Sequence, residues 1–175
     1  MIHPKKSSEG FNEWKCKLMQ WLRDKENQGA TMIYTDGSFM WEKQTGGYSV
    51  CISEWQTWVH DHSDWCAAAS SYNSELAALE STIQWVSIHR CHATCICIAS
   101  DNKSVLSSFL DMSTHSSQTS SLCINLALPD LFAANKDISI CLTHCPSHSS
   151  IPGNEHADKL TTISRSPLPP IASSL

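Results

Sequence analysis

Four acidic residues are placed where they could hold metal ions together, because each lies at or near the end of a predicted element. Asp36 follows one short apolar run and Asp101 follows another, while Glu75 lies in the first turn of a long predicted helix and Asp158 in the last one. If the strands that precede Asp36 and Asp101 are neighbours in a sheet, their side chains emerge side by side at one edge. Clustered carboxylates repel one another, and this repulsion is tolerated mainly where a cation neutralises it.

The donor atoms of this set indicate which cation would bind. Carboxylate oxygens without thiols select hard cations such as Mg²⁺, for which Mn²⁺ can substitute. Two such ions about 3.5–4 Å apart can activate a water on one side of a phosphorus and stabilise the leaving oxygen on the other. Taken singly, however, each carboxylate is most often a solvated surface group. The spacing alone therefore predicts a candidate metal site and no more.

The elements that must position these residues follow from the hydrophobic periodicity. The predicted order is helix, three strands, helix, strand, two helices, strand and helix, over residues 11–27, 31–34, 48–53, 57–69, 73–88, 95–99, 102–110, 122–134, 138–142 and 154–163. A turn at Asp36-Gly37-Ser38 should end the first strand, and Asn73 or Ser74 should cap the long helix. This order predicts an α/β fold in which a five-stranded mixed sheet is flanked by helices.

Length and composition are those of one globular domain. The chain has 175 residues, of which 41% are hydrophobic and 17% charged. No apolar run approaches the roughly 20 residues of a membrane helix, and no apolar signal core follows the polar start, so we expect an intracellular protein with no membrane partner. We expect a basic amphipathic helix and linker at 1–29, the domain at 30–164 and a flexible Pro- and Ser-rich tail at 165–175.

The nine cysteines give no clear disulfide or zinc pattern. Several lie within apolar runs such as Cys95-Ile96-Cys97-Ile98, where reduced, buried thiols are expected. Histidines accompany some of them near residues 89–97 and 144–148, but paired Cys-x-x-Cys knuckles are absent. The spacing therefore argues against a zinc site.

The distribution of charge matters more than its total of −5. Six of the twelve Lys and Arg residues lie in the first 25 positions, and from Ala30 onward six bases face thirteen acids. A domain that held phosphate by itself would normally show a basic stripe. The charge therefore argues mildly against nucleic acid as a partner, and some of the acidic residues must either bind cations or form solvated surface.

Five short blocks, in order across residues 30–164, carry a family resemblance. They are Ile33-Tyr34-Thr35-Asp36-Gly37-Ser38, Gly46-Gly47-Tyr48-Ser49-Val50, Ser74-Glu75-Leu76-Ala77-Ala78-Leu79, Ser100-Asp101-Asn102, and the stretch from Pro146 to Asp158. Together they resemble type 1 ribonuclease H domains, and the last block resembles most those that accompany the reverse transcriptases of non-LTR retrotransposons. The resemblance implies the ribonuclease H-like fold and an endonuclease that hydrolyses the RNA strand of RNA–DNA hybrids.

The resemblance also implies roles for individual residues. Asp36, Glu75, Asp101 and Asp158 match the four carboxylates that bind two Mg²⁺ ions. Asp36 would bridge both ions, Glu75 and Asp101 would hold one of them, and Asp158 would hold the other. His148 matches a loop histidine that assists proton transfer or product release, although without the motif an exposed imidazole would be the simpler interpretation. Glu155, in the first turn of the last helix, is interpreted as structural, and Gly153-Asn154 as the turn and cap that set its angle.

Substrate contacts are expected beside the first and second carboxylates. The family recognises the RNA 2′-hydroxyl with backbone groups after the first Asp, here Gly37 and Ser38, and with polar side chains before the Glu, here Ser71, Tyr72 and Asn73. Ser71 and Tyr72 stand where many members have Asn, and Lys103 where Gln is common. The stretch 111–137, which forms a basic clamp in some bacterial members, has Lys136 as its only Lys or Arg.

Two other functions remain open at this point. The first is a catalytically inactive module that binds nucleic acid or a polymerase. Two features support this alternative: Ser150 stands where family members often have Gly, and the chain has many cysteines. A different metal-dependent nuclease on the same fold is disfavoured by the spacing of ten residues between His148 and Asp158. For the active form, a tethered or associated reverse transcriptase is the expected protein partner.

Overall fold

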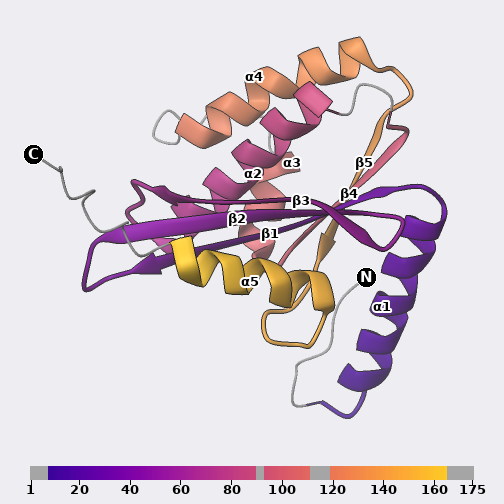
Figure 1. Cartoon of the computed structure of the whole chain (residues 1–175), viewed down its shortest axis with the longest axis horizontal. Helices are drawn as coiled ribbons and strands as arrows, with labels where there is room; N and C mark the ends of the chain where they lie inside the picture. Colours follow the sequence, from indigo (N-terminus) through magenta and orange to yellow (C-terminus); the bar gives the residue numbers. More distant parts are fainter. Residues whose placement is uncertain (1–7, 90–92, 111–118, 165–175) are drawn as a thin grey trace, which may run out of the picture.

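The computed structural model describes residues 8–89, 93–110 and 119–164. Within these ranges the helices and strands follow one another as shown in Figure 1. In chain order they are α1 (Phe11–Asn27), β1 (Thr31–Met40), β2 (Thr45–Glu54), β3 (Thr57–Cys66), α2 (Ser71–His89), β4 (Cys95–Ser100), α3 (Lys103–Leu110), α4 (Thr119–Ala134), β5 (Ser139–His144) and α5 (Pro152–Ser164). Each predicted element is present, although several of its bounds differ from the prediction.

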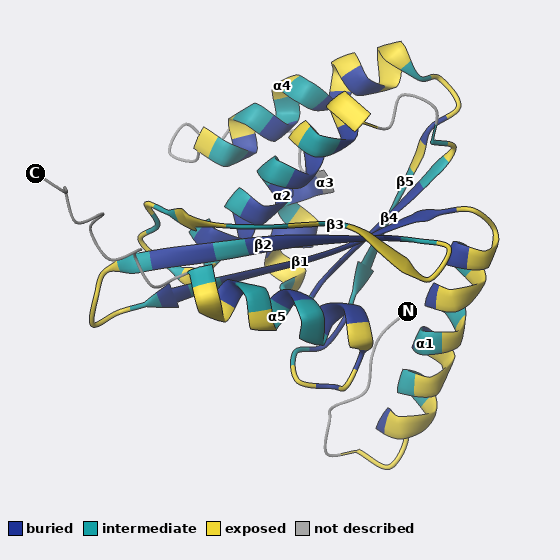
Figure 2. Ribbon diagram, in the orientation of Figure 1, coloured by how far each residue is buried: buried dark blue, intermediate teal, exposed yellow. Residues whose placement is uncertain are grey.

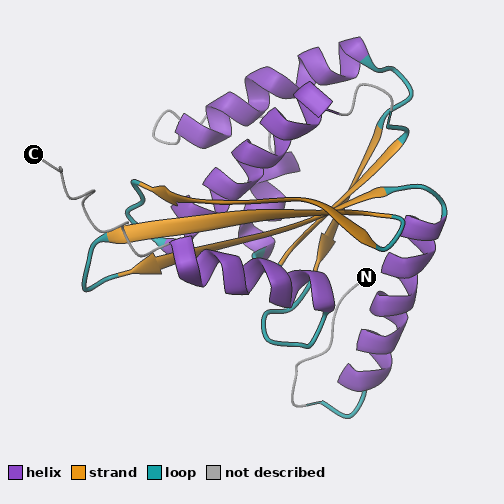
Figure 3. Ribbon diagram, viewed as in Figure 1, coloured by secondary structure: helices purple, strands orange, loops and turns teal. Residues whose placement is uncertain are grey.

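The strands form one mixed sheet in the order β3-β2-β1-β4-β5 (Figure 3). β1, β2 and β3 make an antiparallel meander, whereas β4 runs parallel to β1 and β5 parallel to β4. β1 is therefore central, with an antiparallel neighbour on one side and a parallel neighbour on the other. The predicted five-stranded mixed sheet is confirmed.

Helices cover both faces of the sheet. Helices α2, α3 and α4 lie on one face, and α5 and α1 lie on the other (Figure 1). Side chains of β1 alternate between the two resulting cores: Ile33 packs with α2 residues such as Leu79, and Met32 packs with Leu18 and Leu22 of α1. The central strands are buried on both faces, while the outer faces of the helices are exposed (Figure 2).

Helix α1 is an integral part of the second core. Its predicted bounds are confirmed, and its apolar side packs Leu18 and Leu22 against the sheet. Burying two leucine side chains stabilises this arrangement by about 3–6 kcal/mol before entropy is counted. Its end is tied down as well, since the buried Glu26 carboxylate accepts hydrogen bonds from the Ser53 hydroxyl and from the Gln56 amide at 2.8 Å.

The predicted turn at Asp36-Gly37-Ser38 is wrong. β1 continues through these residues to Met40 and pairs with β2 up to the Met40–Thr45 pair, so the hairpin turn lies at residues 41–44. The Asp-Gly pair suggested a turn because glycine favours turns. Here the glycine instead leaves room for a helix above the strand, as described below.

Three smaller boundary predictions also differ. Helix α2 begins at Ser71 rather than after a cap at Asn73 or Ser74, because the Ser70 hydroxyl accepts a hydrogen bond from the Asn73 amide at 3.3 Å. Glu75 is therefore its fifth residue and lies in its second turn. Helix α4 begins at Thr119, within the predicted loop 113–121. Residues 113–118 of that loop and the predicted tail after residue 164 lie outside the described residues. None of the described helices is both long enough and apolar enough to cross a membrane.

Candidate active site

Three carboxylates that are far apart in the sequence meet at one point of the sheet. Asp36 lies within β1, Glu75 on α2 and Asp101 directly after β4, and their carboxylate oxygens lie within 4.8 Å of one another. The parallel register pairs Thr35 with Ser100, so the residues that follow, Asp36 and Asp101, stand next to each other. The sheet topology alone thus brings two of the three carboxylates together, as the predicted adjacency of the two strands required.

Helix α2 brings the third carboxylate into place because Gly37 lets it approach the strand. A Cβ atom at Gly37 would lie 2.2 Å from the amide nitrogen of Glu75, which is shorter than any side chain permits. Only a glycine at this position allows the helix backbone to rest on β1. The Gly37 backbone also forms a hydrogen bond with the Glu75 carboxylate, which couples the strand to the side chain it positions.

Burial and mutual repulsion disfavour the ionised form of these acids. Burial raises the pKa of Asp36 to about 6, and the Asp101 and Asp158 carboxylates add to the rise. A hydrogen bond from Thr161 and the nearby His148 oppose it. The pKa of Glu75 lies well above its ordinary value for the same reasons, burial first and then the charges of Asp101 and Asp36.

This environment fits a divalent cation. Among the described residues, the Oε2 atom of Glu75 is buried without a hydrogen-bond partner, so one carboxylate oxygen of the clustered residues is unsatisfied. A buried acceptor of this kind is costly unless a cation or a proton meets it. The donor set at the point of convergence is made of oxygen atoms, which is the set that Mg²⁺ and Mn²⁺ prefer.

Asp158 and His148 lie at the margin of this cluster. They do not belong to the group within 4.8 Å, yet both act on Asp36: the charge of Asp158 raises its pKa and that of His148 lowers it. Asp158 is half-buried on α5, and His148 is exposed on the loop 145–151 with a left-handed φ of 50°. The structure therefore brings three predicted ligands together tightly and places the other two predicted catalytic residues near them.

Comparison with known proteins identifies the family. The ribonuclease H family profile matches residues 28–165, which is most of the chain. This chain belongs to the ribonuclease H family. A search of curated proteins found no match.

Solved ribonuclease H structures share the fold at low sequence identity. RNase H1 of the halophilic archaeon Halobacterium salinarum NRC-1 has a TM-score of 0.59 and 17% identity, covering 78% of this chain and 97% of that one. LC11-RNase H1, isolated from compost and solved with an RNA/DNA hybrid, has a TM-score of 0.61 and 14% identity over 77% and 96% of the two chains.

A viral protein also contains a similar domain. The foamy viral protease-reverse transcriptase, solved in complex with an RNA/DNA hybrid, matches with a TM-score of 0.61 and 18% identity. The match covers 78% of this chain but only 20% of the viral one, so this chain spans about a fifth of that polypeptide. At such identities these likenesses show the fold.

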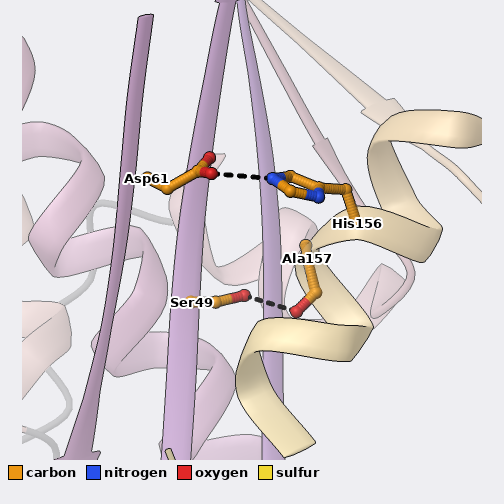
Figure 4. A network of polar contacts seen from close by, with 4 residues as sticks. All are labelled: Ser49, Asp61, His156 and Ala157. Atoms are coloured by element: carbon orange, nitrogen blue, oxygen red, sulfur yellow. Dashed lines mark hydrogen bonds and ion pairs between the residues drawn. The ribbon is translucent and has the colours of Figure 1, made fainter. Parts of the chain in front are cut away.

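In this member of the ribonuclease H family, a buried hydroxyl network that the sequence did not reveal anchors helix α5. The Ser49 hydroxyl on β2 donates to the Ala157 carbonyl at 2.8 Å (Figure 4), and the Thr161 hydroxyl donates to Ser49 at 2.8 Å. Both hydroxyls are fully buried. Because Asp158 follows Ala157, this network fixes the position of Asp158 relative to the sheet. The available signals were a serine within the apolar strand β2 and a threonine four residues after Ala157, on the same helix face.

The interpretation of Gly153-Asn154 as a turn and cap is wrong. Helix α5 already begins at Pro152, and a Cβ at Gly153 would lie 2.3 Å from the ring of Tyr34. Gly153 therefore allows the helix to start directly against β1. The structural interpretation of Glu155 is confirmed, since its carboxylate accepts a hydrogen bond at 3.0 Å from the amide of Ser150, which has a left-handed φ of 57°.

The predicted substrate-contacting residues lie around the same end of α2. Gly37 touches the backbone of Glu75, and Ser38 follows it on β1, half-buried. Ser71 is exposed in the first turn of α2, and the Tyr72 hydroxyl shares a hydrogen bond of 2.7 Å with Ser108 of α3. Asn73 accepts a hydrogen bond from the Ser70 hydroxyl at 2.7 Å and lines an open cleft of about 430 Å³. Their role in binding stays a prediction.

Proposed function

We propose that this ribonuclease H hydrolyses the RNA strand of RNA–DNA hybrids with two divalent metal ions, Mg²⁺ in the first instance. The observation that carries the proposal is the convergence of Asp36, Glu75 and Asp101, together with a buried carboxylate oxygen of Glu75 that has no hydrogen-bond partner among the described residues. Family membership supports the substrate class, and similar structures solved with RNA/DNA hybrids support it further. Catalysis by two ions rests on the four carboxylates and on the family resemblance.

The four carboxylates would each have a distinct role in holding the two ions. Asp36 would hold both ions, because it interacts with Glu75 and Asp101 and also with the more distant Asp158. Glu75 and Asp101 would hold one ion, and Asp158 would hold the other. When bound, such a pair of ions supplies stabilisation of the negative charge that develops on both sides of an attacked phosphorus.

The overall reaction is the hydrolysis of a phosphodiester. The oxygen of a water forms a bond to phosphorus while the bond from phosphorus to the 3′ oxygen breaks, which leaves a 5′-phosphate and a 3′-hydroxyl. His148, exposed on its loop beside Asp36, would exchange a proton through an imidazole nitrogen next to the reacting phosphate. Imidazoles suit this task because they change charge near neutral pH.

Recognition of the hybrid would use the RNA minor groove. The backbone at Gly37 and Ser38 and the first turn of α2 at Ser71, Tyr72 and Asn73 lie beside Glu75, where the 2′-hydroxyl of the cleaved strand would be read. Affinity would be weak and salt-sensitive, because phosphate contacts supply most of the binding energy and this domain carries few bases. Attachment to a reverse transcriptase would compensate by delivering the substrate, and the similar domain within the viral polypeptide supports this arrangement.

The decisive experiment compares four substrates under two conditions. Labelled RNA–DNA hybrid, single-stranded RNA, duplex RNA and duplex DNA are incubated with the full chain, in Mg²⁺ or in chelator. We expect only the RNA strand of the hybrid to be cut, only with Mg²⁺, and the Asp36→Asn variant to be inactive. Binding of the hybrid without cleavage would favour the alternative, an inactive binding module. Cleavage of duplex DNA would indicate a different nuclease on this fold.

A further inference from the structure

A second group of potential metal ligands lies on the α5 side of the sheet. Cys51 on β2 and Asp61 on β3 are directly paired across the two strands, so their side chains point to the same face. His156 of α5 reaches down to them, and its Nε2 atom lies 2.8 Å from Oδ2 of Asp61 (Figure 4). One ligand atom from each of the three residues lies within 4.8 Å of the other two.

This group shares no residue with the carboxylate cluster. Asp36 is paired with Ser49, and Cys51 lies two residues further along β2, on the same face. Two residues along a strand correspond to roughly 6.6 Å. The two groups are thus neighbours with different ligands, and His156 stands two positions before Asp158 on the same helix.

The donor atoms select a different class of cation. A thiolate, an imidazole and a carboxylate together suit a borderline-soft ion such as Zn²⁺, whereas Mg²⁺ prefers oxygen alone. Zinc bonds of about 2.0–2.3 Å place the ligand atoms of a tetrahedral site roughly 3.3–3.7 Å apart. Ligand atoms already within 4.8 Å can reach that spacing by small rotations of the Asp61 and His156 side chains.

The surroundings provide both orientation and access. The His156 ring stacks on Trp58 with centroids 4.5 Å apart, and Trp58 meets the Tyr34 ring edge-on, which restricts the direction of the imidazole. The side chains of His156 and Asp61 are 30% and 39% exposed, while Cys51 is fully buried. Solvent therefore reaches the site from one side, which leaves an entry path and room for a water as fourth ligand.

An ordinary ion pair explains only part of this arrangement. A half-exposed contact between His156 and Asp61 would contribute no more than about 1 kcal/mol, and buried cysteines are common. The Cys51 thiol also donates a hydrogen bond to the Asp61 carboxylate, so all three side chains meet at one point. Burial raises the pKa of the Cys51 thiol, and Asp61 beside it adds to the rise, so the thiolate forms there only if a cation compensates it.

We propose that Cys51, Asp61 and His156 form a second metal site that binds one transition-metal ion of the Zn²⁺ class. On binding, the Cys51 thiol releases its proton to solvent and its sulfur donates an electron pair to the ion. The ion links β2, β3 and α5, and so it fastens the helix that carries Asp158 onto the sheet. This site is independent of the proposed nuclease activity and would exist even in an inactive module.

Cobalt spectroscopy tests the site directly. The full chain, reduced and held in excess Mg²⁺, is titrated with Co²⁺, and the near-ultraviolet absorption of a thiolate–Co²⁺ bond is followed. We expect this band to saturate at one ion per chain and to disappear on addition of Zn²⁺. Cys51→Ser should abolish the band, and Asp61→Asn and His156→Gln should each weaken Co²⁺ binding by roughly tenfold or more.

Two cysteine variants serve as matched controls. Cys16 is exposed on α1 and Cys141 half-buried on β5, so Cys16→Ser and Cys141→Ser should leave the band unchanged. Thermal melts by circular dichroism establish that each variant is folded; Asp61→Asn, at the surface, remains informative if Cys51→Ser does not fold. Any one of three results would overturn the proposal. The wild-type protein shows no band, Cys51→Ser keeps the band, or Asp61→Asn binds Co²⁺ with undiminished affinity.

Discussion

Gly37 of β1 supports Glu75 of α2 backbone to backbone, with only 2.2 Å between the place of a Cβ at Gly37 and the Glu75 amide nitrogen. The contact joins a central strand to the helix that supplies the buried carboxylate. It also explains why an Asp-Gly pair occurs in the middle of a strand. The geometry of the carboxylate cluster thus depends on the absence of a side chain.

Substitution of Gly37 by alanine tests this dependence. The added methyl group must displace α2, so we expect Gly37→Ala to lower the free energy of unfolding by about 1–3 kcal/mol, as overpacking usually does. Cleavage should be lost, because Glu75 moves with its helix. Chemical denaturation and the hybrid assay measure the two effects. Gly10→Ala is the matched control, since nothing lies within 4 Å of a Cβ there. Wild-type stability and activity in Gly37→Ala would refute the proposed role of the contact.

The raised pKa of Asp36 makes stability depend on pH in the metal-free protein. Its folded pKa of about 6 lies above the ordinary 3.8, so the folded state holds the proton more tightly. The contribution of this group is therefore fully present below about pH 4 and is lost as the pH rises to about 6. Asp36→Asn stays neutral, and we expect it to melt at a higher temperature than the wild type at pH 7.5 without metal.

Three features of the Asp36→Asn melts distinguish this explanation from general stabilisation. The difference from wild type should shrink as the pH falls to about 4, where both side chains are neutral. Addition of Mg²⁺ should stabilise the wild type and not the variant, because a bound cation favours the ionised ligand. Cleavage by the variant should be abolished. A melting difference that is independent of pH would show that repulsion at Asp36 is not its cause.

His148 should contribute to turnover rather than to substrate binding. Its exposed loop position beside Asp36 suits proton transfer, and loss of such a group typically slows a reaction by about 10²–10⁴. We choose His148→Asn because asparagine tolerates the left-handed backbone at this position. Single-turnover cleavage should fall while the affinity for hybrid stays the same. His89→Asn, an exposed imidazole at the end of α2, is the control. Full activity of His148→Asn would make His148 a bystander.

Much of the fold could be predicted because local and tertiary signals agree. The order of elements followed from periodicity, and the adjacency of Asp36 and Asp101 followed from treating their strands as neighbours, which the parallel register confirms. The turn at Gly37 was predicted wrongly because glycine permits both a turn and a close helix contact. Only the three-dimensional structure distinguishes these two uses.

The polar groups that the sequence did not predict are all formed by residues far apart in the chain. Ser49 and Thr161 interact across 112 positions of sequence, and Cys51 meets Asp61 and His156 through a strand pairing and a helix. No spacing rule reports such contacts, since zinc motifs are recognised by ligands that are close in sequence. The metal-binding roles of the four predicted carboxylates stay a prediction, although three of them converge.

Helix α1 carries four basic residues that are candidate phosphate contacts: Lys15, Lys17, Arg23 and Lys25. Deletion of residues 1–27 would be the obvious test of its role in binding, but Leu18 and Leu22 pack against Met32, and the deletion would expose this core. Charge removal is cleaner: Lys17 and Arg23 are exposed, and Lys17→Gln with Arg23→Gln leaves the apolar side intact. If α1 contacts phosphates, the double variant should bind hybrid more weakly.

Salt dependence measures how many phosphate contacts the double variant has lost. The slope of log affinity against log salt should decrease by about 0.7–0.9 for each phosphate contact removed, which fluorescence anisotropy can resolve between low and physiological salt. Lys136→Gln, exposed in the segment after α4, is the control for a general change of net charge. An unchanged affinity and slope in the double variant would remove α1 from substrate binding and leave delivery to an attached polymerase. Equal losses per charge removed, in the double variant and in Lys136→Gln, would instead indicate a general effect of net charge, because the change would then not depend on where the cation lies.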